Sequence, residues 1–148
     1  MFSQKLRFHL NAIRDGDTLI ASTNSQTESI RLYGIDCPEL AQKPYGVLAR
    51  QRIQALLAPY RWFEAVPVDR DTHDRLVAEI WVEDGCINTQ LLAEGFAIAY
   101  TRHLKPGYRE RYLAAEATAR KARLNFWSQP QPELPWDYRR RHPRNREG

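Results

Sequence analysis

The stretch R-L-Y-G-I-D-C-P-E at residues 31–39 is apolar except for one arginine and two acids. Its aliphatic residues predict a short buried strand, while its glycine and proline are typical of turns. Arg31 would then lie on the strand, with Asp36 and Glu39 just beyond its end. Function concentrates in segments that a rigid scaffold positions, so these three charged side chains are candidate functional residues.

Two other turns carry similar side chains. D-G-D-T at residues 15–18 places two acids in one tight turn, and D-T-H-D-R at residues 71–75 leads an arginine into a strand. Clustered carboxylates suit a hard cation such as calcium, and arginine suits phosphate because its planar fork donates two hydrogen bonds. A cation, arginines and a carboxylate base are the parts that a phosphodiesterase needs. On spacing alone, turn-capping aspartates and surface ion pairs remain an open alternative.

The patterning of the whole chain predicts an α+β domain. Strands are expected at residues 6–13, 18–21, 30–35, 62–68 and 76–82, and helices at 45–57, 87–94 and 108–124. A small five-stranded sheet needs its edges protected, and a barrel of the OB type with packed helices provides this. The domain is expected to span residues 1–128. The proline- and arginine-rich residues 129–148 are expected to form an irregular tail.

Composition excludes several classes of protein. The chain has 148 residues, 43% of them hydrophobic, which suits one globular domain. No apolar run approaches the ~20 residues that cross a bilayer, and the first ten residues lack the apolar core of a signal peptide. We therefore expect a soluble protein, either exported or cytoplasmic. Cys37 and Cys86 are too few for a disulfide scaffold and lack the spacing of a zinc site, so isolated thiols are expected.

The net charge of +4 conceals an uneven distribution. Residues 1–101 carry 10 basic and 13 acidic side chains, whereas residues 102–128 carry 7 basic and 2 acidic ones. The basic surplus can face a polyanion or simply solvate the surface. Residues 139–141, all arginine, are interpreted as part of a solvated tail, with electrostatic attraction to nucleic acid as the alternative.

Taken in order, these segments resemble the staphylococcal nuclease (thermonuclease) family. The three charged turns are followed by I-N-T-Q-L-L-A-E-G-F-A at residues 87–97 and A-T-A-R-K-A-R-L-N-F-W-S at residues 117–128, so the resemblance covers roughly residues 5–128. It implies a five-stranded OB-fold β-barrel with three packed α-helices. It also implies a calcium-dependent endonuclease that hydrolyses DNA and RNA at the P–O5′ bond and leaves 3′-phosphate ends.

The resemblance further implies roles for the calcium turn. Asp17 and Asp36 would be carboxylate ligands of Ca²⁺, and Cys37 would contribute its backbone carbonyl. Asp15 would orient these ligands from behind.

Catalytic roles follow from the same motifs. Glu39 would be the general base that activates the attacking water. Arg31 and Arg75 would bind the scissile phosphate and offset the charge that grows on it in the pentacoordinate transition state.

The nucleotide pocket departs from the family pattern. The family commonly has D-K-Y-G-R or D-R-Y-G-R at residues 71–75, where lysine and tyrosine help to hold the nucleotide. Thr72, His73 and Asp74 therefore predict a weaker or differently selective pocket, with His73 and Tyr100 as the nucleotide-binding candidates.

Two functions from different classes are compatible with the sequence. The leading one is a nuclease, expected to be a monomer, acting on DNA and RNA substrates, preferably single-stranded, with no membrane partner. The alternative is a catalytically silent OB-fold module that binds nucleic acid or a protein. The presence of all the charged motif residues favours the nuclease, because a silent module does not need them together.

Overall fold

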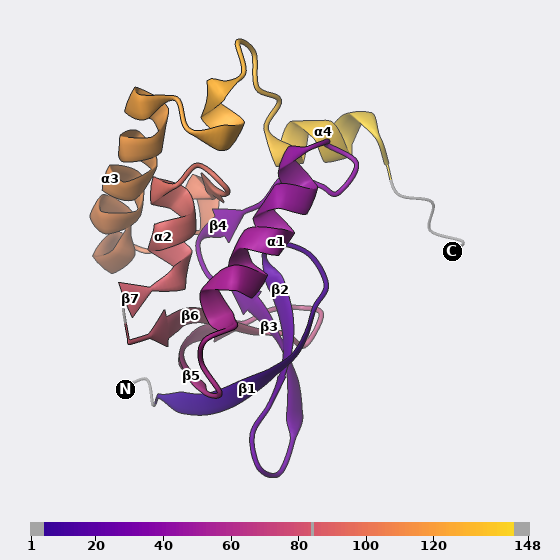
Figure 1. Cartoon of the computed structure of the whole chain (residues 1–148), viewed down its shortest axis with the longest axis vertical. Helices are drawn as coiled ribbons and strands as arrows, with labels where there is room; N and C mark the ends of the chain where they lie inside the picture. The colour runs from indigo at the N-terminus through magenta and orange to yellow at the C-terminus, as the bar shows by residue number, and fades with distance from the viewer. Residues whose placement is uncertain (1–4, 84, 144–148) are drawn as a thin grey trace.

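The computed structural model describes residues 5–83 and 85–143 and has a closed five-stranded barrel at its centre (Figure 1). The barrel strands are β1 (Leu6–Ile13), β2 (Thr18–Ser22), β3 (Thr27–Leu32), β5 (Phe63–Arg70) and β6 (Leu76–Val82). Antiparallel pairing runs in the order β3-β2-β1-β5-β6, and a parallel pairing of β3 with β6 closes the barrel. Closure leaves no long free edge, so the barrel protects the strand edges, which is the reason that the sequence predicted a barrel. The α+β OB-type fold is confirmed.

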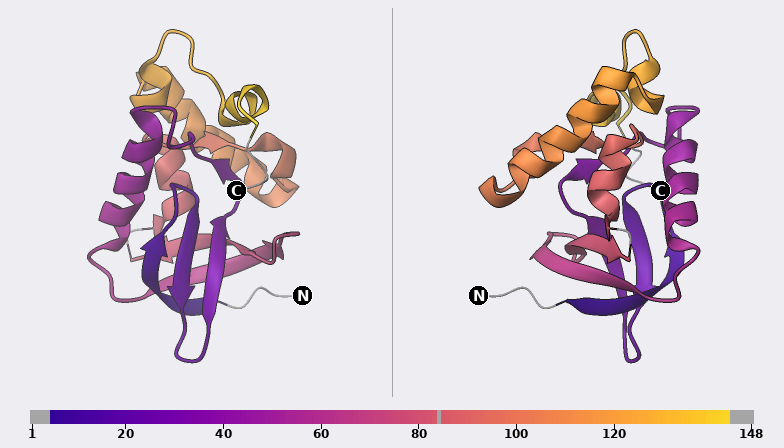
Figure 2. Two further views of the ribbon diagram at one scale, coloured as in Figure 1. Left: turned by 90° about the vertical axis from the view of Figure 1, so that its right-hand side faces the viewer. Right: turned by 60° about the vertical axis from the view of Figure 1, so that its left-hand side comes forward.

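Helices cover the barrel and connect its strands. They are α1 (Tyr45–Leu57), α2 (Ile87–Ala93), α3 (Pro106–Ala122) and α4 (Pro135–Arg141), with short helical turns η1 (Thr101–His103) and η2 (Asn125–Ser128). Three two-residue strands complete the described fold: β4 (Ile35–Asp36) pairs with β8 (Ile98–Ala99), and β7 (Gly85–Cys86) pairs antiparallel with the end of β6. In Figure 2, α2 lies between α1 and α3 and contacts both. None of the helices in the described residues is long and apolar enough to span a membrane.

The core fills the barrel and the space beneath the helices. Phe8, Leu19 and Ile30 from the strands and Ile53 from α1 are among its fully buried side chains. Tyr112 of α3 is also fully buried and donates its hydroxyl to Glu79 at 2.7 Å. Tyr108, one turn earlier on α3, also packs against the core. Both cysteines are buried free thiols, which confirms that expectation.

Asn88 ties α2 to the barrel and to the strand end that carries the site. Its Oδ1 accepts the N–H of Ile80 at 2.9 Å, and its Nδ2 donates to the carbonyls of Tyr33 at 2.9 Å and Ala78 at 3.2 Å. The side chain is fully buried. Each of the three backbone groups would therefore lose a partner that water cannot replace if the amide were removed.

Asn88→Ala is expected to lower the free energy of unfolding by about 2–4 kcal/mol, because buried polar groups would be left without partners. Urea denaturation measures the change. Asn24→Ala, in the exposed turn between β2 and β3, is the control and is expected to change stability by less than about 0.5 kcal/mol. A similar small loss for Asn88→Ala would contradict the assignment.

The C-terminal segment differs from the expectation of an irregular tail. Residues 135–141 form α4, which returns to the molecule beside the loop that precedes α1 (Figure 1). Pro135 occupies the first turn and is buried, and Asp137 near the start and arginines near the end suit the helix dipole. Trp136 stacks on Tyr100. These contacts with distant segments hold the helix, so local composition did not indicate it.

Candidate active site

The D-G-D-T turn between β1 and β2 is held in one conformation. Asp15 Oδ1 accepts the backbone N–H of Asp17 at 3.1 Å, which forms a local turn. A Cβ on Gly16 would lie 2.8 Å from the Cys37 sulfur and 2.9 Å from the Cβ of Ala49. Only glycine permits this close approach, so the turn packs directly against the segment after β4 and against α1.

Arg31 on β3 lies between the two predicted calcium ligands. Its Nη1 is 3.5 Å from Asp17 Oδ2, and its Nη2 is 4.0 Å from Asp36 Oδ1. Asp17 Oδ2 also accepts the backbone N–H of Cys37 at 3.2 Å. The Asp36 side chain is only 2% exposed, so these charges interact away from bulk water.

Cys37 contacts this group through its backbone N–H. Its thiol is buried, and burial raises the pKa of that thiol well above its usual value. The sulfur is therefore a packing group in this structure. The role of the Cys37 carbonyl as a calcium ligand stays a prediction.

Glu39 is placed by the loop between β4 and α1. Its backbone N–H donates to Gln42 Oε1 at 2.8 Å, and its carbonyl accepts the N–H of Gln42 at 2.8 Å. A Cβ on Gly46 would overlap the Glu39 carbonyl, so glycine in α1 lets the loop lie against the helix. These contacts fix the backbone, and the half-buried carboxylate lines a pocket together with Asp17, Asp36 and other charged side chains.

Arg75 reaches the same pocket from the turn before β6. Its Nε donates to Asp71 Oδ2 at 2.8 Å, and its Nη1 donates to Thr18 Oγ1 at 3.2 Å. Asp71 also accepts the backbone N–H groups of Arg75 and His73. Burial by itself would raise the pKa of the Asp71 carboxyl, but these hydrogen bonds outweigh it and lower that pKa. Asp71 therefore acts as a fixed anion that orients the guanidinium.

Arg139 of α4 also contacts acids of the pocket. Arg139 Nη2 is 2.6 Å from Asp36 Oδ2, and its Nη1 is 3.1 Å from Glu39 Oε2. The guanidinium thus bridges a predicted calcium ligand and the predicted general base. The interpretation of residues 139–141 as part of a solvated tail is wrong for Arg139, because α4 folds back onto the site.

Burial and repulsion between acids raise two pKa values here. Burial, reinforced by the charge of Asp17, raises the pKa of Asp15 to about 7. Burial also raises the pKa of Asp36 to about 6 despite the hydrogen bond from Arg139, and Asp17 adds to the effect. The pKa of Asp17 is lowered, because Arg31 and several hydrogen bonds outweigh its burial.

The donor set fits a hard dication in its chemistry. Asp17 and Asp36 offer buried carboxylate oxygens, the type of ligand that calcium prefers. Within residues 5–83 and 85–143, no group of three or more His, Cys, Asp or Glu is arranged to hold a metal. Instead, the guanidinium groups of Arg31 and Arg139 lie against these oxygens.

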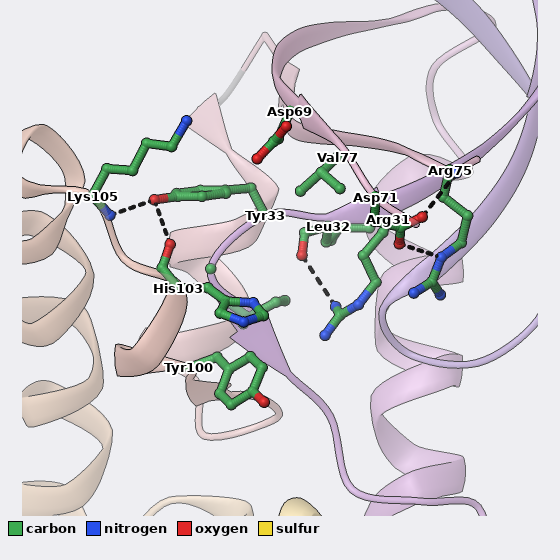
Figure 3. A pocket seen from close by; sticks show the side chains of 12 residues that line it. Arg31, Leu32, Tyr33, Asp69, Asp71, Arg75, Val77, Tyr100, His103 and Lys105 are labelled. Atoms are coloured by element: carbon green, nitrogen blue, oxygen red, sulfur yellow. Dashed lines mark hydrogen bonds and ion pairs between the residues drawn. The ribbon is translucent and has the colours of Figure 1, made fainter. Parts of the chain in front are cut away.

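A cavity of about 390 Å³ lies next to the charged group (Figure 3). Tyr100, His103 and Lys105 form one wall, and Arg31 and Arg75 form another. Figure 3 shows these side chains around one space. Tyr33, which also lines the cavity, donates its hydroxyl to the His103 carbonyl and accepts the backbone N–H of Lys105. Aromatic rings beside cationic side chains can accept a planar base and its phosphate.

His73 is the predicted site residue that stands apart. It lies at the exposed tip of the turn before β6 and is not among the residues that line the cavity. Its role in nucleotide binding therefore stays a prediction, whereas Tyr100 does line the cavity. Sequence reasoning missed His103 and Lys105, although their closeness to Tyr100 in the chain was a usable signal. It also missed Arg14, which directly precedes the D-G-D-T turn and lines the same pocket as Asp17 and Glu39.

Comparison with known proteins decides the family. The sequence model described as "Staphylococcal nuclease homologue" matches residues 29–129, more than half of the chain. The chain belongs to the staphylococcal nuclease family. This agrees with the closed barrel and with the order of the charged motifs.

Three relatives are similar to this chain along most of their own length. Micrococcal nuclease of Shigella flexneri is 36% identical over an alignment covering 86% of this chain and 77% of the relative. Thermonuclease of Staphylococcus intermedius is 33% identical, with coverage of 76% and 71%. Protein ParB of Escherichia coli is 31% identical, with coverage of 92% and 80%. The span matched by the family model includes Arg31, Asp36, Glu39 and Arg75, and it ends before α4.

Proposed function

We propose that this chain is a calcium-dependent nuclease that hydrolyses DNA and RNA at the P–O5′ bond. The observation that carries the proposal is one pocket that gathers acids and arginines from four separate segments. It is lined by Arg14, Asp15, Asp17, Thr18, Arg31, Asp36, Glu39, Arg75 and Arg139. Membership of a family whose relatives are named nucleases supports the same conclusion.

Asp17 and Asp36 would hold the calcium ion, with the Cys37 carbonyl as a further ligand. When bound, the ion offsets negative charge on the phosphate and makes phosphorus more open to attack. Displacing Arg139 from Asp36 frees the carboxylate for this role. Asp15 keeps the D-G-D-T turn in place through its bond to the Asp17 N–H.

Glu39 accepts a proton from the water that attacks phosphorus, and the new P–O bond forms as the P–O5′ bond breaks. The arginines act on the phosphate, since Arg31 and Arg75 donate to its non-bridging oxygens and offset charge in the transition state. The 5′ oxygen leaves, takes a proton from solvent and becomes a 5′-hydroxyl. The product retains a 3′-phosphate.

The cavity beside the arginines supports the proposal that single strands are preferred. An unpaired base can reach the ring of Tyr100, while its phosphate lies near Arg31 and Arg75. A base stacked inside a duplex cannot enter without being unpaired, which costs free energy. We therefore propose that single-stranded DNA and RNA, and frayed duplex ends, are the preferred substrates of a monomeric enzyme.

Single-stranded DNA and RNA oligonucleotides, each incubated with calcium or with EDTA, test this proposal. Cleavage is expected only with calcium, faster on single strands than on matched duplex, with 3′-phosphate ends visible by mass spectrometry. Binding without cleavage in calcium would overturn the proposal and favour the catalytically silent OB-fold module. Cleavage that persists in EDTA would overturn its calcium dependence.

A further inference from the structure

Helix α4 contacts the candidate active site at two separate points. At one end, the ring of Trp136 stacks on the ring of Tyr100, with centroids 5.4 Å apart and an interplanar angle of 23°. At the other, Arg139 bridges Asp36 and Glu39. The same short helix therefore contacts Tyr100, an aromatic residue of the cavity wall, and two acids of the charged pocket.

The contacts of Arg139 and Trp136 coincide with positions that ligands of a nuclease need. The Asp36 oxygen that lies 2.6 Å from Arg139 is one that a cation would have to approach. A guanidinium and a dication cannot share that oxygen closely, because their charges repel each other at short range. Trp136 likewise covers a ring face of Tyr100 on which a base would stack.

Two further contacts involve Glu133, which precedes α4 in the chain. Gln42 donates its side-chain amide to the Glu133 carbonyl at 2.9 Å, and Arg141 pairs with the Glu133 carboxylate at 2.8 Å. The helix has seven residues, which is too short to be stable alone in water. Its position therefore depends on its contacts with the rest of the molecule, those with the site among them.

We propose that α4 is an intramolecular inhibitor, which must leave the site before a divalent cation and a nucleotide base can bind there. The identity of these ligands rests on the proposed function. Binding of the cation to Asp36 then requires the release of Arg139, and binding of Arg139 to Asp36 requires the release of the cation. Only molecules with α4 displaced can bind calcium. The apparent calcium affinity is therefore the affinity of the open site multiplied by the fraction of molecules in which α4 is displaced. The helix lies beyond residues 29–129, the span that the family model matches.

Arg139→Gln in the full chain tests the competition directly. Isothermal titration with CaCl₂ is expected to show binding on the order of 10-fold tighter than in the unchanged protein, because the competing charge is gone. Arg140→Gln is the matched control, since Arg140 is the next residue on α4 and pairs with Asp137 of the same helix. Equal calcium affinities for all three proteins, or no binding by any of them, would overturn the proposal.

Hydrogen exchange in the unchanged protein gives an independent measurement. Amides of residues 135–141 are expected to exchange faster when calcium and a single-stranded oligonucleotide are added, because α4 is released. Unchanged or slower exchange at these amides, with calcium bound, would contradict the release.

The inference and the proposed function can fail separately. Calcium-dependent cleavage with no difference in calcium affinity between Arg139→Gln and Arg140→Gln would leave the nuclease standing and remove the inhibitor. Tighter calcium binding by Arg139→Gln, without cleavage by any of the proteins, would keep the competition and remove the nuclease.

Discussion

Glu39→Gln is expected to slow calcium-dependent cleavage of single-stranded DNA by about 10²–10⁴-fold, the usual contribution of a general base. The amide has the size of the carboxylate but cannot accept a proton from water. The backbone contacts of this residue with Gln42 do not involve the side chain and should persist. We therefore expect kcat to fall while the substrate KM changes little, measured with a labelled oligonucleotide at saturating calcium.

The contact with Arg139 makes this prediction sharper. Glu39→Gln removes one of the two acids that Arg139 bridges, so it should loosen α4 and ease access to the site. A large loss of rate would then occur despite better access, which excludes tighter inhibition as its cause. Glu64→Gln, on an exposed position of β5, is the control and should leave the rate unchanged. A Glu39→Gln protein within threefold of the unchanged rate would remove Glu39 from the role of base.

Arg31→Lys is expected to lower kcat by about 10²–10³-fold, the cost typical of removing one donor to a developing anion. Lysine keeps the positive charge between Asp17 and Asp36, so the folded state retains a cation there. It loses the planar fork, and its single ammonium cannot contact both acids and a phosphate oxygen at once. Because the missing bonds matter most in the transition state, kcat should fall more than KM rises.

Lysine rather than alanine is the informative substitution at this position. The Arg31 side chain is 16% exposed and Asp36 is 2% exposed, so removing the charge would leave buried carboxylates without compensation and endanger folding. Circular dichroism with thermal unfolding checks that Arg31→Lys folds. Arg70→Lys is the matched control, since Arg70 pairs with Glu28 and Asp74 on an exposed part of β5. If Arg31→Lys and Arg70→Lys cleave at the same rate, Arg31 does not bind the reacting phosphate.

Local patterning predicted the secondary structure well. The helical spacing of apolar residues gave α1 its observed bounds, Tyr45–Leu57, and the apolar run at β6 gave Leu76–Val82. Gly95, which directly follows the helix predicted at residues 87–94, has a φ of +79°, which a residue with a side chain rarely adopts. These features depend on interactions between residues a few positions apart, so a sequence window contains what determines them.

Long-range pairing explains what the sequence did not reveal about the site. His103 and Lys105 enter the cavity wall because the segment after β8 turns toward Tyr33, to which both are bonded through their backbones. Arg139 reaches Asp36 across 103 positions of the chain. Nothing in the proline- and arginine-rich segment indicates that Arg139 would contact Asp36, since the composition of that segment is typical of a solvated tail.

The sequence by itself determined the order of the elements and the charged turns that follow or precede the strands. It also determined which residue types a phosphodiesterase site would use, because those depend on the chemistry of single side chains. Only the tertiary structure decided that β3 pairs with β6, which brings Arg31 and Arg75 to one pocket. It alone decided that α4 lies on that pocket. Both outcomes depend on closing long loops around a shared core, and the free energy of doing so belongs to the whole fold rather than to any segment.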